Sequence, residues 1–153
     1  MTFSGFTDDT PLTTVENDGW WPAMNVDYFK KVYRIPVEYT AELVKDALQQ
    51  GMIWANRQLA EWKAARVLEG YADLASVPGD KLGIDPVYVM HYRRAVSCQA
   101  KALLLPQFKT MLRRDGSANA AVESVETEDK FYQLAQDAIG DFLGTGRINV
   151  ELL

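Results

Sequence analysis

Two stretches with the apolar spacing of amphipathic helices, joined by a connection containing Gly and Pro, constrain the fold of this chain most strongly. In residues 37–68, apolar and small side chains recur mostly every three or four positions, so they fall on one face of a helix. That face comprises Tyr39, Leu43, Ala47, Gly51, Trp54, Ala55, Leu59 and Trp62. In the second stretch, residues 86–112, the small side chains of Ala95, Cys98 and Ala102 would let a neighbouring helix approach closely. The pattern predicts helices that pack on other helices, and therefore an all-α fold.

Turn and capping signals indicate where these two helices begin and end. Pro36 is expected in the first turn of a helix that begins at about residue 36 or 37, and Gly70 is expected just beyond its end at residue 68. The pair Asp85-Pro86 is typical of a cap and first turn, so it is expected to start the second helix. Pro106 lies inside that helix and removes one backbone hydrogen bond, which predicts a kink.

Shorter elements are predicted on both sides of this pair. A short helix capped by Asn25 or Asp27 is expected to continue to Tyr33, with an inner face made of Val26, Phe29, Val32 and Tyr33. Residues 113–125 contain Gly, Ser and Asn and are predicted to form a loop, followed by a last helix from Thr127 to Gly144. Residues 147–152 alternate polar and apolar side chains, the pattern of a short strand.

The chain therefore divides into three predicted parts: an extended acidic N-terminal arm at residues 1–24, a small bundle of three to four helices at residues 25–146, and a short strand-like tail at residues 147–153. The arm contains two adjacent tryptophans, which need to be buried either on the chain's own bundle or against a neighbouring subunit or partner. The candidate interface residues are Trp20, Trp21, Pro22, Ile148, Val150, Leu152 and Leu153.

The negative charge of the chain is concentrated in the arm. The net charge of the whole chain is −5, and residues 1–29 contain five acidic residues and no Lys or Arg. Residues 30–153 contain 16 basic and 16 acidic residues, so this part of the chain is neutral. A dedicated binder of the phosphate backbone needs a basic surface. The charge balance therefore argues against that class and predicts no basic surface.

The sequence offers few groups for catalysis or metal binding. His91 is the single histidine and Cys98 the single cysteine, and both are more typical of packed structural residues than of a catalyst or ligand. Neither a phosphate-binding glycine motif nor a nucleophile turn is present. We expect no enzymatic activity, no cofactor and no metal. Met1–Pro11 lacks the pattern of a signal peptide and no apolar run is long enough to span a bilayer, so we expect a soluble protein of a reducing cytoplasm.

Two arginine pairs remain candidates for polar contacts. Arg93-Arg94 lies in the second predicted helix and Arg113-Arg114 at its end. These side chains could contact DNA phosphates, or form salt bridges within or between subunits, and the neutral balance of residues 30–153 favours salt bridges.

The order and spacing of several motifs resemble the head completion/stabilisation protein (GpL) family of temperate contractile-tailed phages. The resemblance covers residues 21–153. Pro106 departs from the family pattern, in which a helix-compatible residue is expected at this position. It is carried by a short helix at residues 26–34, by Asn56, Leu59 and Trp62, by Gly70, Tyr71, Leu74, Val77 and Pro78, by the helical segment Tyr92-Arg93-Arg94-Ala95-Val96, and by the tail from Arg147 to Leu152.

The resemblance implies a structural connector between head and tail. Such a protein would form a ring, of twelve subunits in this family, beneath the portal protein. It would stabilise the DNA-filled capsid and offer a docking surface to a neck or tail-completion protein. Packaged double-stranded DNA would pass through the ring without sequence-specific binding, and no membrane would be involved. The expected location is the virion neck, after assembly in the cytoplasm of the bacterial host.

Two other classes remain open from the residues alone. A DNA-binding packaging component, such as a small terminase-like helical protein, would bind duplex DNA in a salt-sensitive way. A cellular helix-bundle regulator would bind a partner helix in a groove and have no affinity for a portal. We expect the isolated chain to be a monomer or a weak oligomer, because ordering flexible ends costs free energy without a template.

Overall fold

The computed structural model describes residues 13–113 and 118–145, with side chains described at 13–107 and 128–145. Within these residues the helices are α1 (Val26–Val32), α2 (Ala41–Gln58), α3 (Ala60–Leu68), α4 (Val87–Arg113) and α5 (Ala118–Leu143), with a 3-10 turn at Leu74–Ser76. Two short antiparallel pairs accompany them: β1 (Thr14–Val15) with β2 (Met24–Asn25), and β3 (Lys81–Leu82) with β4 (Asp85–Pro86). The all-α prediction is confirmed. No helix in the described ranges is long and apolar enough to cross a membrane.

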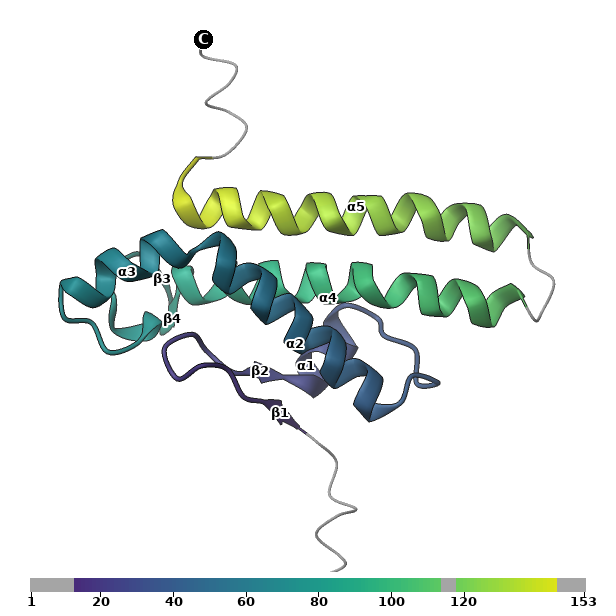
Figure 1. The fold of residues 1–153 in the computed structure, drawn as a ribbon, viewed down its shortest axis with the longest axis horizontal. Coiled ribbons are helices and arrows are strands. Elements are labelled where there is room, and N and C mark those ends of the chain that lie inside the picture. The colour runs from purple at the N-terminus through teal and green to yellow at the C-terminus, as the bar shows by residue number, and fades with distance from the viewer. Residues whose placement is uncertain (1–12, 114–117, 146–153) are drawn as a thin grey trace, which may run out of the picture.

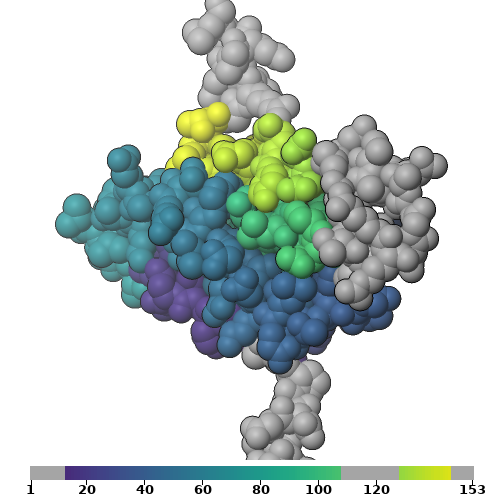
Figure 2. Space-filling model, turned by 45° about the vertical axis from the view of Figure 1, so that its right-hand side comes forward, coloured from purple at the N-terminus to yellow at the C-terminus, as the bar shows by residue number. Residues whose placement is uncertain are grey.

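Helix α4 is the centre of the molecule. Helix α5 runs antiparallel along one side of it, and α2 crosses another side (Figure 1). In Figure 2 the green atoms of α4 are visible between blue α2 and yellow-green α5. Four consecutive residues of α4, from Ala95 to Cys98, are buried, so this segment is covered all round. Ala95, Cys98 and Ala102 are each at most 1% exposed, as their small size predicts.

Gly51 allows the closest approach between α2 and α4. A Cβ atom added to Gly51 would lie 2.7 Å from the carbonyl oxygen of Val96 and 3.2 Å from Cγ1 of the same residue. Any larger side chain at this position would push the two backbones apart. The predicted face of residues 37–68 is confirmed at Ala47, Gly51 and Ala55, which are buried. Leu43, Trp54 and Trp62 of the same predicted face are half-buried.

The predicted long helix at residues 37–68 differs from the structure at two points. It begins at Ala41 rather than near Pro36, because the Thr40 hydroxyl caps the first turn by accepting a hydrogen bond from the Leu43 amide at 3.2 Å. It is also divided at Leu59, whose φ of −108° and ψ of 13° interrupt the helix, so that α3 starts at Ala60. Leu59 is fully buried, so its anchoring in the core accompanies the change of direction.

The N-terminal boundary predicted at residue 24 is wrong, because residues 13–24 belong to the packed body. Val15 and Met24 face each other in the β1–β2 pair, and their exposed fractions are 1% and 0%. The amide of Val26 donates to the carbonyl of Thr13 at 2.8 Å and continues the pairing to the start of α1. The negative charges at residues 16–18 are therefore carried by a folded loop.

Other predicted boundaries also require correction. The loop predicted at residues 113–125 is wrong from Ala118 on, because α5 starts there, nine residues before Thr127. The alanines at the start of α5 are strong helix formers, which outweighs the polar residues among them. The pair Asp85-Pro86 forms β4, and α4 begins at the next residue. On α1, the Asn25 cap is confirmed by a 2.8 Å bond from the Tyr28 amide, whereas Val32 is exposed.

The predicted end of α5 and the predicted kink in α4 have different outcomes. Helix α5 ends at Leu143, followed by Gly144 with φ of 73°, as predicted. Pro106 lies within α4, which continues to Arg113. The kink near Pro106 remains a prediction. The strand predicted at residues 147–152 lies outside the described residues.

Candidate functional site

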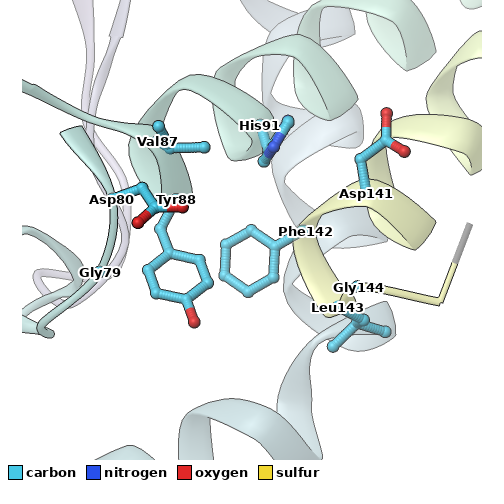
Figure 3. A pocket seen from close by; sticks show the side chains of 9 residues that line it. All are labelled: Gly79, Asp80, Val87, Tyr88, His91, Asp141, Phe142, Leu143 and Gly144. Carbon is cyan, nitrogen blue, oxygen red and sulfur yellow. The ribbon is translucent and has the colours of Figure 1, made fainter. Parts of the chain in front are cut away.

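The sole histidine lines an open pocket at one end of the helix bundle. The pocket has a volume of about 380 Å³ and lies between the loop at Gly79 and Asp80, the first turns of α4, and the end of α5. Figure 3 shows Tyr88 and Phe142 side by side in it, with His91 and Asp141 on separate helices farther up. The ring centroids of Tyr88 and Phe142 are 5.0 Å apart.

This pocket lacks the connections that acid–base or metal chemistry requires. Within the described ranges no hydrogen bond or ion pair joins His91 to Asp80 or Asp141. In that part of the chain there is also no group of three or more His, Cys, Asp or Glu side chains that could hold a metal ion. A catalytic triad needs a nucleophile, a base and an orienting group in mutual hydrogen-bond contact. The described residues therefore offer no candidate catalytic arrangement at this pocket.

An aromatic cluster lies next to the pocket and contains both tryptophans of the predicted interface. Trp21 stacks on Tyr92 with 4.7 Å between ring centroids, and Trp20 packs edge-on to Trp21 at 4.8 Å. Trp62 from α3 and Phe142 from α5 complete the contact, with centroids 4.7 Å apart. Trp20 and Trp21 are 8% and 3% exposed, so they fold back onto their own bundle. Of the two sites of burial that the sequence left open, the structure supports the intramolecular one.

Asp18 holds the two indoles in place. Its Oδ1 atom accepts hydrogen bonds from the amides of Trp20 and Trp21 at 3.0 and 2.9 Å. Its Oδ2 atom accepts a 2.9 Å charged hydrogen bond from Lys63 of α3. Burial raises the pKa of the Asp18 carboxyl, but these hydrogen bonds and the charge of Lys63 outweigh burial, and the pKa is lowered. The ionised carboxylate thus joins the N-terminal loop to α3.

The same loop is joined to α2 and α4 by three polar side chains. The Tyr92 hydroxyl donates to Oδ1 of Asn56 at 2.5 Å and accepts from Nδ2 of Asn17 at 2.7 Å. Nδ2 of Asn56 donates to Oδ1 of Asn17 at 3.1 Å, which closes the triangle. Burial raises the pKa of Tyr92 far above its ordinary value, so the hydroxyl stays protonated and can donate. A part-buried hydrogen-bond network of this kind fixes the position of the elements it joins.

The remaining predicted site residues have separate positions. Arg93 and Arg94 lie on α4 and line a second hollow. Cys98 is buried beside Tyr33, and burial raises the pKa of its thiol, as expected for a packed structural cysteine. Pro22 is half-buried, and its carbonyl accepts a hydrogen bond from Asn17 at 3.0 Å. The Arg113 side chain, Arg114, Ile148, Val150, Leu152 and Leu153 lie outside the described side chains.

Comparison with known proteins decides what kind of protein this arrangement belongs to. The profile of the family described as phage head completion protein (GPL) matches residues 15–153. The chain belongs to the phage head completion protein family. That match covers the whole packed body, starting at Val15 in β1.

Two relatives of this head completion protein carry matching names. The chain is 28% identical over 151 residues, 99% of each chain, to the "Probable head completion/stabilization protein" of Haemophilus phage HP1. It is 23% identical over 129 residues to the "Head completion/stabilization protein" of Escherichia phage P2, covering 84% of this chain and 73% of the relative. No solved structure matches the chain.

Four of the residues that carried the family resemblance contact the N-terminal loop of this head completion protein: Asn56, Trp62, Tyr71 and Leu74. Asn56 belongs to the polar triangle and Trp62 to the aromatic cluster. The carbonyl of Tyr71 accepts a hydrogen bond from the Trp20 indole at 3.1 Å, and the amide of Leu74 donates to the Trp20 carbonyl at 3.0 Å. These motif residues therefore hold the N-terminal loop on the helical body, which is a structural role.

Sequence reasoning missed the two polar residues that organise this region. The sequence pattern places Asn17 and Asp18 in an extended acidic arm, whereas in the structure both side chains form hydrogen bonds with the helical body. One local signal was available, because Asn and Asp before Gly are typical of turns in which the side chain accepts backbone amides. Their partners on α2, α3 and α4 are 39 or more residues away and leave no local signal of this kind.

Proposed function

We propose that this head completion protein is a non-enzymatic connector that forms a ring beneath the portal of the DNA-filled head and offers a docking surface to the neck or tail. The observation that carries the proposal is the family match over residues 15–153, which spans the whole packed body rather than one motif in it. The module recognised as a head completion protein is therefore the fold described above. We propose the virion neck as its location and the host cytoplasm as the place of assembly.

The use of polar and aromatic side chains supports a structural role. Asn17, Asn56 and Tyr92 satisfy one another, and Asp18 is occupied by two amides and Lys63. Groups that are committed to internal hydrogen bonds hold elements together and are not available to a substrate. This favours a rigid building block whose outer surfaces make the functional contacts.

Co-sedimentation with DNA-filled heads that carry a portal but lack a tail tests the proposal. The purified chain is added at increasing concentration, and the bound copies per head are counted by mass. We expect saturation near twelve copies, as the family resemblance implies, and no binding to heads that lack the portal. Binding spread over the whole capsid would contradict the connector. Absence of binding to heads, together with salt-dependent retention on free duplex DNA, would favour the packaging component instead.

The state of the free chain provides a second test. We expect a monomer or weak oligomer at micromolar concentration in analytical ultracentrifugation, with the ring forming on the portal. A stable ring of the purified chain without heads would contradict this order of assembly.

A further inference from the structure

The fold gathers four positive charges along the line where α1 and the turn that follows it pack on α4. We name this line the α1–α4 seam and define it by Arg34, Arg93, Arg94 and Lys101. The Arg93 guanidinium lies 5.6 Å from the ring centroid of Tyr28 on α1. The Lys101 ammonium donates a hydrogen bond to the carbonyl of Tyr33, directly after α1. Although the total charge of residues 30–153 is balanced, the expectation of no basic surface is wrong at this seam.

These charges are not neutralised by ion pairs within the described part of the chain. The ion pairs found there join Lys63 to Asp18 and Arg66 to Glu69, and neither involves the seam. The pKa of Lys101 is lowered, first by burial and then by the nearby charge of Arg34. Asp85 is the acidic residue that lines the hollow beside the seam. A partner that brings negative charge would relieve the repulsion among these cations.

The hollow beside the seam also offers apolar contacts. Its volume is about 450 Å³, and Arg93 and Arg94 line it together with Tyr28, Leu82 and Met90. These last three side chains are 40%, 64% and 37% exposed, so their apolar surfaces are accessible to a ligand. A ligand that fits this surface needs acidic and apolar side chains together. A bare phosphodiester backbone supplies only the negative charge, so a peptide segment fits better than DNA.

The first twelve residues of this chain have the required composition. They read MTFSGFTDDTPL, with Phe3 and Phe6 as apolar groups, Asp8 and Asp9 as acidic groups, and no Lys or Arg. A segment of this length can span up to about 40 Å when extended. It enters the folded body at a defined point, because the Thr13 carbonyl is bonded to the Val26 amide at the start of α1.

We propose that residues 1–12 of one copy dock on the α1–α4 seam and its hollow in the neighbouring copy, with Asp8 and Asp9 facing Arg93 and Arg94. The arm of every copy then binds the seam of one neighbour, and its own seam binds the arm of the other neighbour. Such a head-to-tail contact between different surfaces closes into a ring when the rotation between copies allows it. This inference rests on the ring in the proposed function and names the contact that links neighbouring subunits.

A charge-swap series on the full-length chain tests the contact. One variant carries Asp8→Lys and Asp9→Lys, a second carries Arg93→Glu and Arg94→Glu, and a third combines all four changes. The readout is saturation binding to DNA-filled, tailless heads, with circular dichroism and thermal unfolding to verify folding. We expect each two-residue variant to bind about tenfold more weakly, because attraction becomes repulsion at two exposed charge pairs. The four-residue variant should recover most of the loss.

Mixing the two two-residue variants distinguishes the neighbouring copy from the chain's own seam. In an alternating ring each reversed arm meets a reversed seam and each native arm meets a native seam, so an equimolar mixture should bind better than either variant alone. If the arm docks on its own seam, the mixture gains nothing while the four-residue variant still recovers, and the proposal is overturned. The control Lys45→Glu/Arg57→Glu makes an equal change of charge on the exposed surface of α2 and should bind as the native chain does.

Further outcomes separate this inference from the proposed function. If the native chain binds heads and both reversed variants bind equally well, the connector stands and the arm contact is wrong. If the native chain does not bind heads, the connector proposal is wrong. The self-association of the same variants is then measured by sedimentation of the free chain at high concentration. The arm contact is then also wrong, unless the native chain self-associates and the two charge-reversed variants do not.

If the Arg93→Glu/Arg94→Glu variant does not fold, the milder variant Arg93→Gln/Arg94→Gln takes its place. Duplex DNA binding that is lost on reversal of the two arginines would assign the seam to DNA and overturn the proposal.

Discussion

The indole of Trp21 lies flat against the ring of Tyr92, with 4.7 Å between centroids and 10° between planes. This contact joins the N-terminal loop to the central helix α4 across 71 positions of sequence. The Tyr92 hydroxyl meanwhile bonds to Asn56 on α2. Tyr92 therefore serves as the point where the loop, α2 and α4 are held in one arrangement, and the stability of the fold should depend on the groups that touch it.

Truncation of Trp21 tests the stacked contact. We expect Trp21→Ala to lower the free energy of unfolding by about 3–5 kcal/mol, because it leaves a cavity against Tyr92 and Phe142. Urea unfolding followed by circular dichroism measures this. Val37→Ala is the matched control, since Val37 is 92% exposed and its truncation should change stability by less than about 0.5 kcal/mol. Similar stabilities of the two variants would show that Trp21 is not part of the core.

Removal of one amide tests the polar triangle. Asn56→Ala leaves the Tyr92 hydroxyl without its acceptor and Asn17 without one donor. The expected loss is about 1–3 kcal/mol of unfolding free energy, the cost of a buried polar group left unpaired. Gln50→Ala on the exposed side of α2 is the control and should be close to neutral. A neutral effect of Asn56→Ala in thermal and urea unfolding would contradict a role for the triangle.

Gly51→Ala tests the close approach of α2 and α4. Alanine favours a helix over glycine by about 1 kcal/mol. Its Cβ would, however, lie 2.7 Å from the Val96 carbonyl oxygen, which belongs to the backbone of a buried helix and cannot rotate away. Overpacking of this kind costs about 1–3 kcal/mol, so we expect a net loss of stability. An increase in the unfolding midpoint would mean that the two helices can separate freely.

The dependence of stability on pH tests the role of Asp18. Its pKa in the folded protein is below the ordinary value of 3.8, so the folded state favours the ionised carboxylate. The stabilisation is therefore present above that ordinary value and is lost as the pH falls through the lower pKa of the folded state. Unfolding midpoints of the native chain and of Asp18→Asn should converge below pH 3.8 and separate at neutral pH. Parallel curves across this range would exclude the contribution.

Much of the helical body could be predicted because its signals are local. The burial of Ala47, Gly51 and Ala55 follows from a spacing of four residues, and the Asn25 cap and the Gly144 end follow from single side chains. The positions at which this reasoning was wrong are those where local preference competes with burial or with a neighbouring cap. Leu59 interrupts the helical pattern of residues 37–68 where its side chain is buried in the core. Pro36 was expected in the first turn of this helix, but the helix is capped by Thr40 and begins after it.

The candidate site was less predictable, because its residues meet only in three dimensions. The sequence by itself determined the fold class, the absence of recognisable catalytic motifs, and the presence of two indoles that required burial. Only the tertiary structure decided that Trp20 and Trp21 are buried on their own chain and that Asn17 meets Tyr92. It also brought Arg34, Arg93, Arg94 and Lys101 to one seam within a chain of balanced charge. Helix periodicity and capping depend on neighbours within a few residues, whereas burial and local charge depend on which distant surfaces pack together.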